Sequence, residues 1–240
     1  MNALNDFMRD FAGYGHLPAP LWFVGMEEGG GSNVAELQRR VETWEARGRR
    51  PLEDLAEFHH AIGEAKYFRE PYPLQPTWAS LARILQSWHG AAADVPSLQQ
   101  VQATSLGSKD GLASLVELLP LPSPSVRSWP YATLADEHPS LVDRKRYVSA
   151  HLSARIGMLR GLVREAHPRA VVFYGLGYLK HWSAISDETL SPAQIEAKLC
   201  YMGAKRSPYS IVVPHPAARG MPKRFWHAVG AHLRDITSVP

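Results

Sequence analysis

The sequence predicts an α/β protein, a three-layer α/β/α sandwich with a central four-stranded parallel sheet. Three observations lead to this fold class: four short runs of apolar residues, helical patterns between them, and turn or loop residues after each run. Runs that are apolar at nearly every position are typical of strands buried on both faces. Strands that alternate with helices favour a parallel sheet with helices on both sides.

Each element can be placed along the chain. The four strands are expected at 21–25, 113–119, 170–175 and 210–214. Helices are expected at 33–47, 52–66, 77–89, 143–166 and 224–236. Ser32 or Asn33 can cap the first of these helices, and Thr77, which follows Pro76, can cap the third.

Composition limits the class of protein. The 240 residues, 45% of them hydrophobic, favour one domain over 1–240. Cys200 is the only cysteine, which excludes an internal disulfide or a four-cysteine metal site and fits a reducing cytoplasm. The 11 histidines show no metal-ligand spacing and no cofactor motif is complete, so neither metal nor cofactor is expected.

The sequence has no signal-peptide pattern and no apolar stretch long enough for a membrane span. The net charge of +3 permits binding to a polyanion.

Two adjacent carboxylates follow the first predicted strand. In LWFVGMEEGGG, residues 21–31, Glu27 and Glu28 stand between an apolar strand and three glycines. A carboxylate beside an apolar sheet is costly unless it is solvated, paired or used. In an α/β sheet, ligands collect beyond the carboxyl ends of the strands. This pair is therefore either a candidate functional site or a polar loop.

A histidine between two prolines follows the last predicted strand. In IVVPHPAARGMPKRFW, residues 211–226, the prolines restrict the backbone around His215. The next helix is expected to start near Pro222, so Arg219, Lys223 and Arg224 lie near its positive end, a candidate phosphate site. The alternative is a structural histidine next to a solvated helix start.

Together, GMEEGGG and VVPHPAARGM resemble the two signature motifs of the uracil-DNA glycosylase superfamily, an acidic loop bounded by glycines and a loop of His, Pro and small residues. The segments YPLQPTWASLARIL (72–85), VELLPLPSP (116–124) and VVFYGLGYLKHW (171–182) resemble the intervening landmarks in the same order. The resemblance covers residues 20–235 and implies that family's fold, with a monomer that acts on single- or double-stranded DNA.

The resemblance also implies roles for individual residues. Breaking an N-glycosidic bond makes the sugar cationic and the departing base anionic. Glu27 would stabilise the cation and orient or deprotonate water, with Glu28 as the other candidate for this place. His215 would donate to a carbonyl oxygen of the base, and Tyr72 would stack on the flipped-out base. Arg219 or Met221 would fill the gap in the duplex. The remaining candidates are Gly25, Met26, Gly29, Glu117 and Pro216 for the substrate and Lys223 and Arg224 for DNA.

Two positions depart from the family's pattern. The first motif lacks the usual proline after the acidic residue, and Glu117, or Leu118 after a one-residue shift, stands where the family often has a base-reading asparagine. An asparagine both donates and accepts, whereas an ionised glutamate only accepts. Glu117 must therefore be protonated, face elsewhere, or read a base with extra donors; a pairing with an arginine is the structural alternative.

These observations predict a metal-independent DNA base-excision glycosylase. Two alternatives remain: a relative that binds nucleic acid without catalysis, and a hydrolase or transferase that acts on a small nucleotide. DNA binding that is sensitive to salt but without base release would indicate the first. Protection against heating by a free nucleotide, but not by DNA, would indicate the second.

Overall fold

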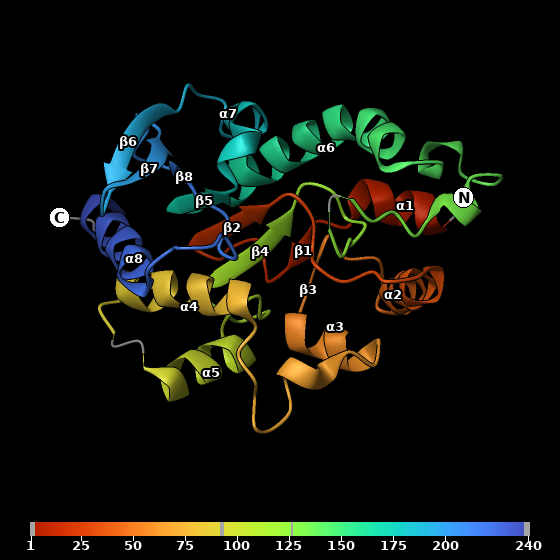
Figure 1. The fold of residues 1–240 in the computed structure, drawn as a ribbon, viewed down its shortest axis with the longest axis horizontal. Helices are drawn as coiled ribbons and strands as arrows, with labels where there is room; N and C mark the ends of the chain where they lie inside the picture. Colours follow the sequence, from red (N-terminus) through yellow and green to blue (C-terminus); the bar gives the residue numbers. More distant parts are fainter. Residues whose placement is uncertain (1–2, 92–93, 126, 238–240) are drawn as a thin grey trace.

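The computed structural model describes residues 3–91, 94–125 and 127–237. The chain forms an α/β fold around one mixed, mostly parallel sheet of eight strands with the order β3-β1-β4-β2-β5-β8-β7-β6 (Figure 1). The four strands at its centre are mutually parallel: β4 (Ala113–Glu117), β2 (Leu21–Gly25), β5 (Ala170–Tyr174) and β8 (Tyr209–Val213). They are the four strands that the apolar runs predict.

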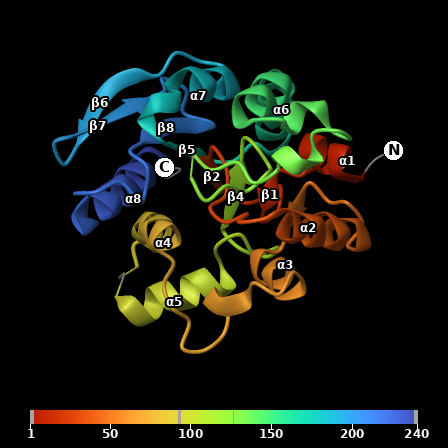
Figure 2. The ribbon, with the colours of Figure 1, turned by 45° about the vertical axis from the view of Figure 1, so that its right-hand side comes forward.

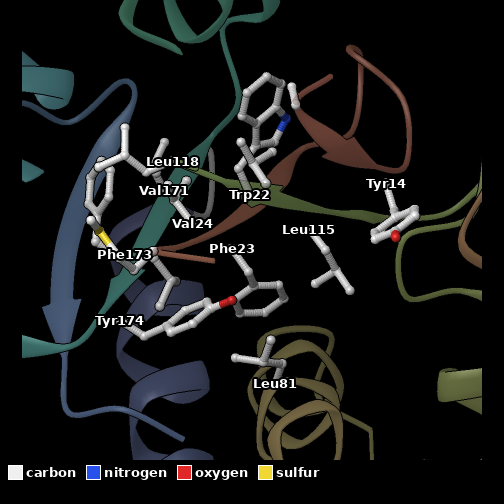
Figure 3. Close-up of a cluster of buried hydrophobic side chains, with 14 of the residues drawn as sticks. Tyr14, Trp22, Phe23, Val24, Leu81, Leu115, Leu118, Val171, Phe173 and Tyr174 are labelled. Carbon is white, nitrogen blue, oxygen red and sulfur yellow. The ribbon is translucent and has the colours of Figure 1, made fainter. Parts of the chain in front are cut away.

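Every residue of the four central strands is buried, as expected for a sheet covered on both faces. Helices α1 (Ala3–Asp10), α6 (Arg144–Ala166) and α7 (Leu179–Ser186) cover one face. Helices α4 (Pro76–Trp88) and α8 (Lys223–Thr237) pack against each other on the opposite face, as both views show (Figures 1 and 2). Trp22 and Phe23 point to opposite sides of β2, and Phe23 points toward Leu81 of α4 (Figure 3).

The sheet is wider than the sequence predicts. β1 (Gly13–Tyr14) is antiparallel to β4 and parallel to β3 (Leu52–Glu53) at one edge. At the other edge, β6 (Ser191–Ile195) and β7 (Lys198–Met202) form an antiparallel hairpin next to β8. β1 and β3 have only two residues each, and β6 mixes polar and apolar residues, so these three carry no continuous apolar run. β7 contains a short apolar run at 199–202 that was not predicted as a strand. The prediction of a four-stranded sheet is therefore wrong in strand number and right for the parallel centre.

The helix predictions hold for the long helices but not for 52–66. α2 (Val34–Ala46) begins after Asn33, whose side chain accepts a hydrogen bond from the backbone N–H of Glu36, as predicted for a cap. α4 is capped by Gln75 instead of Thr77. In the segment 52–66, Leu52–Glu53 is strand β3, and Asp54 caps a short helix, α3 (Leu55–Ala61). Two further helices were not predicted: α1, and α5 (Val95–Thr104), which packs against α4.

The order of the four central strands places a crevice at their carboxyl ends. The chain leaves β2, builds β4 on one side of it, and then builds β5 and β8 on the other. The loops after β2 and β5 therefore leave in different directions, which is where open α/β sheets bind ligands. The loops that contain Glu27 and His215 begin at this edge.

Candidate active site

A cavity of about 500 Å³ opens at the carboxyl ends of the parallel strands. This volume is within the range of sites that bind small molecules or a single nucleotide. Its wall combines the exit of β2, the ends of β4 and β5, the loop after β8, and the segment before α4. The lining residues are Met26, Glu27, Glu28, Gly29, Gly30, Glu36, Arg40, His59, Glu64, Lys66, Tyr67, Gln75, Thr77, Trp78, Glu117, Ser123, Pro124, Ser125, Tyr174, Tyr178 and His215.

The two residues expected to carry the chemistry share this cavity. Glu27 enters its wall from the loop after β2, and His215 enters from the loop after β8. β5 is the only strand between β2 and β8 in the sheet order. An acidic and an imidazole side chain therefore line one hollow, although 188 residues separate them in the sequence (215 minus 27).

Glu27 is held by an arginine from α6. Nη2 of Arg144 donates to both carboxylate oxygens of Glu27, each at 2.7 Å. Both side chains are partly buried, with 10% of Glu27 and 21% of Arg144 exposed. Arg144 therefore fixes the orientation of this carboxylate at the cavity wall.

Glu28 belongs to a dense polar network. Its carboxylate accepts hydrogen bonds from both terminal nitrogens of Arg40, from the Tyr14 hydroxyl and from Nε2 of His59, at 2.7–3.2 Å. Burial alone would raise the pKa of Glu28, but the charge of Arg40 and the hydrogen bonds from His59 and Tyr14 outweigh burial and lower it. With its oxygens already engaged, Glu28 has the environment of a structural residue.

Glu117, Gly25 and Tyr174 form a row across three neighbouring strands. Gly25 pairs with Glu117 in the sheet register, and Tyr174 follows Phe173, the partner of Val24. A β-carbon at Gly25 would overlap the hydroxyl of Tyr174. The glycine therefore lets the phenol lie across β2, and its hydroxyl donates to Oε1 of Glu117 at 3.3 Å.

The Glu117 carboxyl group lies in the cavity wall, and no cation among the described residues forms an ion pair with it. Its residue is only 8% exposed, and among the described residues no hydrogen-bond partner reaches Oε2. Arg155 binds the backbone carbonyls of Glu117 and Leu118 instead of the carboxyl group. Burial, and then the negative charge of Glu28, raise the pKa of Glu117 well above its usual range. Of the options left by the sequence, the structure favours a protonated Glu117; Leu118 is buried and does not line the cavity.

The His215 loop fixes the histidine tautomer. The backbone N–H of Ala217 donates to Nδ1 of His215 at 3.1 Å, so a neutral ring carries its proton on Nε2. The ring lies edge-on to Tyr174, with centroids 5.6 Å apart. The side chain reaches solvent at the cavity mouth, but the protein atoms around it lower its pKa through partial desolvation. His215 can therefore present an N–H donor to the cavity at neutral pH.

The structure places Tyr72 outside the cavity lining. Its backbone oxygen accepts from Gln99 of α5, in a segment also tied to Gln102. The aromatic residues that line the cavity are Tyr67, Trp78, Tyr174 and Tyr178. Sequence reasoning missed them as site residues. The signal was position: Tyr67 precedes α4 and Trp78 lies in its first turn, and Tyr174 ends β5 with Tyr178 shortly after it.

The residues predicted to contact DNA lie outside the cavity lining. Arg219 and Lys223 are exposed, and Met221 is partly buried against the core. Arg224 pairs with Glu196 of the β6–β7 hairpin at 3.0 Å. Pro216 is buried beside His215 and, like these four residues, is not part of the cavity lining.

Two searches of the described residues were negative. No group of three or more His, Cys, Asp or Glu side chains in the described part of the chain is arranged to hold a metal ion. Within residues 3–91, 94–125 and 127–237, no helix has both the length and the apolar sequence required to cross a membrane.

Comparisons with known proteins leave the chain without a demonstrated family. No protein-family model matches the sequence, and no curated protein gives a significant match. The residues of the cavity are therefore the basis for assigning a function.

Proposed function

We propose that this protein is a DNA base-excision glycosylase of the uracil-DNA glycosylase type, which hydrolyses the N-glycosidic bond of a flipped-out, deaminated or damaged base. The observation that carries the proposal is that Glu27 and His215 line one cavity at the carboxyl ends of the parallel strands. The parallel centre of the sheet also consists of the four strands that the family resemblance uses.

The chemistry follows from the charges that develop as the bond breaks. The sugar approaches an oxocarbenium cation, which the Glu27 carboxylate would stabilise while it orients the attacking water. The departing base gains negative charge on a carbonyl oxygen, to which Nε2–H of His215 would donate. The hydrogen bond from Ala217 supports this role because it leaves the proton on Nε2.

The surroundings of the two residues fit a nucleotide. Tyr67, Trp78 and Tyr178 offer aromatic surfaces in the cavity for a flipped-out base. Arg219 and Lys223 are exposed near the start of α8, where they would contact DNA phosphates. The proposal needs no metal ion and only one copy of the chain.

One observation favours a relative that binds DNA without catalysis. Arg144 engages both oxygens of Glu27, which weakens its ability to act on a cation or a water molecule. For full activity, the substrate would have to displace this ion pair or use the carboxylate alongside it. A second candidate, a hydrolase or transferase of small nucleotides, is favoured only by the cavity volume.

Base release from defined oligonucleotides tests the proposal. The protein is incubated with DNA that contains uracil, hypoxanthine, xanthine or a thymine mismatch, and abasic sites are quantified. We expect release of at least one of these bases, and a loss of about 10²–10⁴-fold in rate for Glu27→Gln and for His215→Ala. Glu42→Gln, at an exposed position of α2, is the matched control and should keep the wild-type rate.

The proposal fails if the wild type releases none of these bases, or if both site variants act as fast as Glu42→Gln. Salt-sensitive DNA binding without base release would instead support the non-catalytic relative. Thermal protection by free nucleotides but not by DNA would support a small-nucleotide enzyme.

A further inference from the structure

Glu117 is a buried carboxyl group with one oxygen engaged and one unused. Tyr174 donates to Oε1, while Oε2 has no hydrogen-bond partner among the described residues. The side chain lines the cavity that contains Glu27 and His215. A buried polar atom without a partner is costly, and in a ligand site the ligand can supply the missing partner.

Three arginines of the site are engaged with other groups, and of these the charge of Arg155 acts against the rise in the pKa of Glu117. Arg40 binds Glu28, Arg144 binds Glu27, and Arg155 binds backbone carbonyls. The other groups that act on the Glu117 carboxyl are the carboxylates of Glu27 and Glu28 and the hydroxyl of Tyr174. Two negative neighbours and no paired cation favour the protonated form of Glu117.

A protonated carboxyl group has the hydrogen-bonding pattern of an amide, with one donor and one acceptor. The hydroxyl of Tyr174 fixes which oxygen plays each part, because its donation to Oε1 makes Oε1 the carbonyl oxygen. The proton then belongs on Oε2, the oxygen without a partner. The oxygen Oε1 retains a second lone pair for a ligand N–H.

We propose that Glu117, as a carboxylic acid oriented by Tyr174, recognises the lactam edge of a base, –NH–C(=O)–: Oε2–H donates to the ring carbonyl oxygen and Oε1 accepts the ring N–H. This inference rests on the proposed function for its ligand class but concerns base recognition and not bond cleavage. Uracil and hypoxanthine carry this edge. Cytosine substituted at its glycosidic nitrogen presents an amino donor and an unprotonated ring nitrogen instead, so both of its groups would face the wrong partner.

Binding of bases methylated at the glycosidic nitrogen tests this recognition without requiring catalysis, because the methyl group removes the N1–H/C2=O edge that free cytosine would otherwise share with uracil. 1-Methyluracil, 9-methylhypoxanthine and 1-methylcytosine, called uracil, hypoxanthine and cytosine below, are titrated against the wild type, Glu117→Gln, Glu117→Ala and Tyr174→Phe by calorimetry between pH 5 and 8.5. We expect uracil and hypoxanthine to bind about tenfold or more tighter than cytosine. Glu117→Ala should lose this preference, and Tyr174→Phe should reduce it because the carboxyl proton can then move to either oxygen.

The pH dependence separates a carboxylic acid from a purely structural glutamate. Wild-type affinity for uracil should fall as the pH rises and Glu117 ionises. Glu117→Gln places an amide of the same shape at this position, and an amide does not ionise. This variant should keep the preference for uracil over cytosine, and its affinity for uracil should not decrease as the pH rises. Because His215 is present in both proteins, its own titration cancels in the comparison. Infrared spectra should show a protonated-carboxyl band in the wild type at pH 7 that is missing in Glu117→Gln, and melting curves should confirm that each variant is folded.

The inference is overturned if the wild type binds none of the bases, if cytosine binds as tightly as uracil, or if Glu117→Gln keeps the wild-type pH profile. Its failure is distinct from failure of the proposed function. A protein that releases uracil from DNA but binds free bases without preference would retain the activity and lose this account of specificity. A protein that binds uracil through Glu117 but does not release it from DNA would retain this account of specificity and lose the proposed activity.

Discussion

Glu28 and Glu117 line the same cavity and are both largely buried, yet their surroundings drive their charges in opposite directions. Burial favours the neutral form of each carboxyl group. At Glu28, Arg40 and two further donors reverse that preference. At Glu117, the single donor, Tyr174, does not offset burial and the negative charge of Glu28. The comparison teaches that partners, and not depth of burial, decide which carboxyl group is charged.

Removal of the cation from the Glu28 network should have the largest effect. Arg40→Met leaves Glu28 in a buried site with no paired charge, so we expect a loss of about 3–5 kcal/mol in the free energy of unfolding. Urea denaturation measures this change. Arg224→Gln, which breaks an exposed ion pair with Glu196, should cost less than about 1 kcal/mol. If the two variants lose similar amounts, the Glu28 network is not a stabilising one.

The contributions of Glu117 and Glu28 to the free energy of unfolding should change with pH in opposite directions. The pKa of Glu117 is raised in the folded state, so the stability it contributes is fully present below its unfolded value of about 4.5 and is lost as the pH rises through the folded pKa. Glu117→Gln should therefore gain stability relative to the wild type by up to about 1.4 kcal/mol per pH unit above that value. Chemical denaturation at pH 5, 6 and 7 measures the difference. A constant difference over this range would mean that Glu117 is ionised in the folded protein.

Glu28 should show the opposite behaviour. Its pKa is lowered on folding, so its contribution is present above about 4.5 and disappears as the pH falls below that value. Acid unfolding of the wild type should therefore begin in this range.

Substitution of Gly25, which lies between Glu117 and Tyr174 in the sheet, should have a smaller effect on the free energy of unfolding. Gly25→Ala places a β-carbon against the hydroxyl of Tyr174 and should cost about 1–3 kcal/mol, because Tyr174 must move away from Glu117. Gly29→Ala is the matched control, since no atom lies within 4 Å of a β-carbon there, and it should change stability by less than about 0.5 kcal/mol. Equal melting temperatures for the two variants would contradict the close approach of Tyr174 to β2.

The parts of the fold that could be predicted are those encoded by local pattern. The apolar runs that form β2, β5 and β8 identify the strands because each strand is buried on both faces. β6 could not be found in this way, because its pattern is not continuously apolar. β7 has a short apolar run at 199–202, which was not recognised as a strand. Strand β3 was concealed within a helical pattern that Asp54 interrupts by capping α3.

The sequence predicts where the candidate site lies but not which side chains bond to one another there. Strand ends point to Glu27 and His215, since parallel strands bring their carboxyl ends to one edge. The partners of the two glutamates come from distant segments: His59 is 31 residues from Glu28, and Arg144 is 117 residues from Glu27. Only tertiary packing determines which arginine reaches which carboxylate, so the charge states could not be derived from the sequence.

The most direct test of the central claim, that Glu27 and His215 act across one cavity, is a crystal structure of Glu27→Gln bound to an oligonucleotide that contains a deaminated base. The account predicts the flipped-out base in the cavity, its sugar beside residue 27 and a carbonyl oxygen within hydrogen-bond distance of Nε2 of His215. DNA bound with the base still stacked in the duplex, or on a surface away from this cavity, would contradict it.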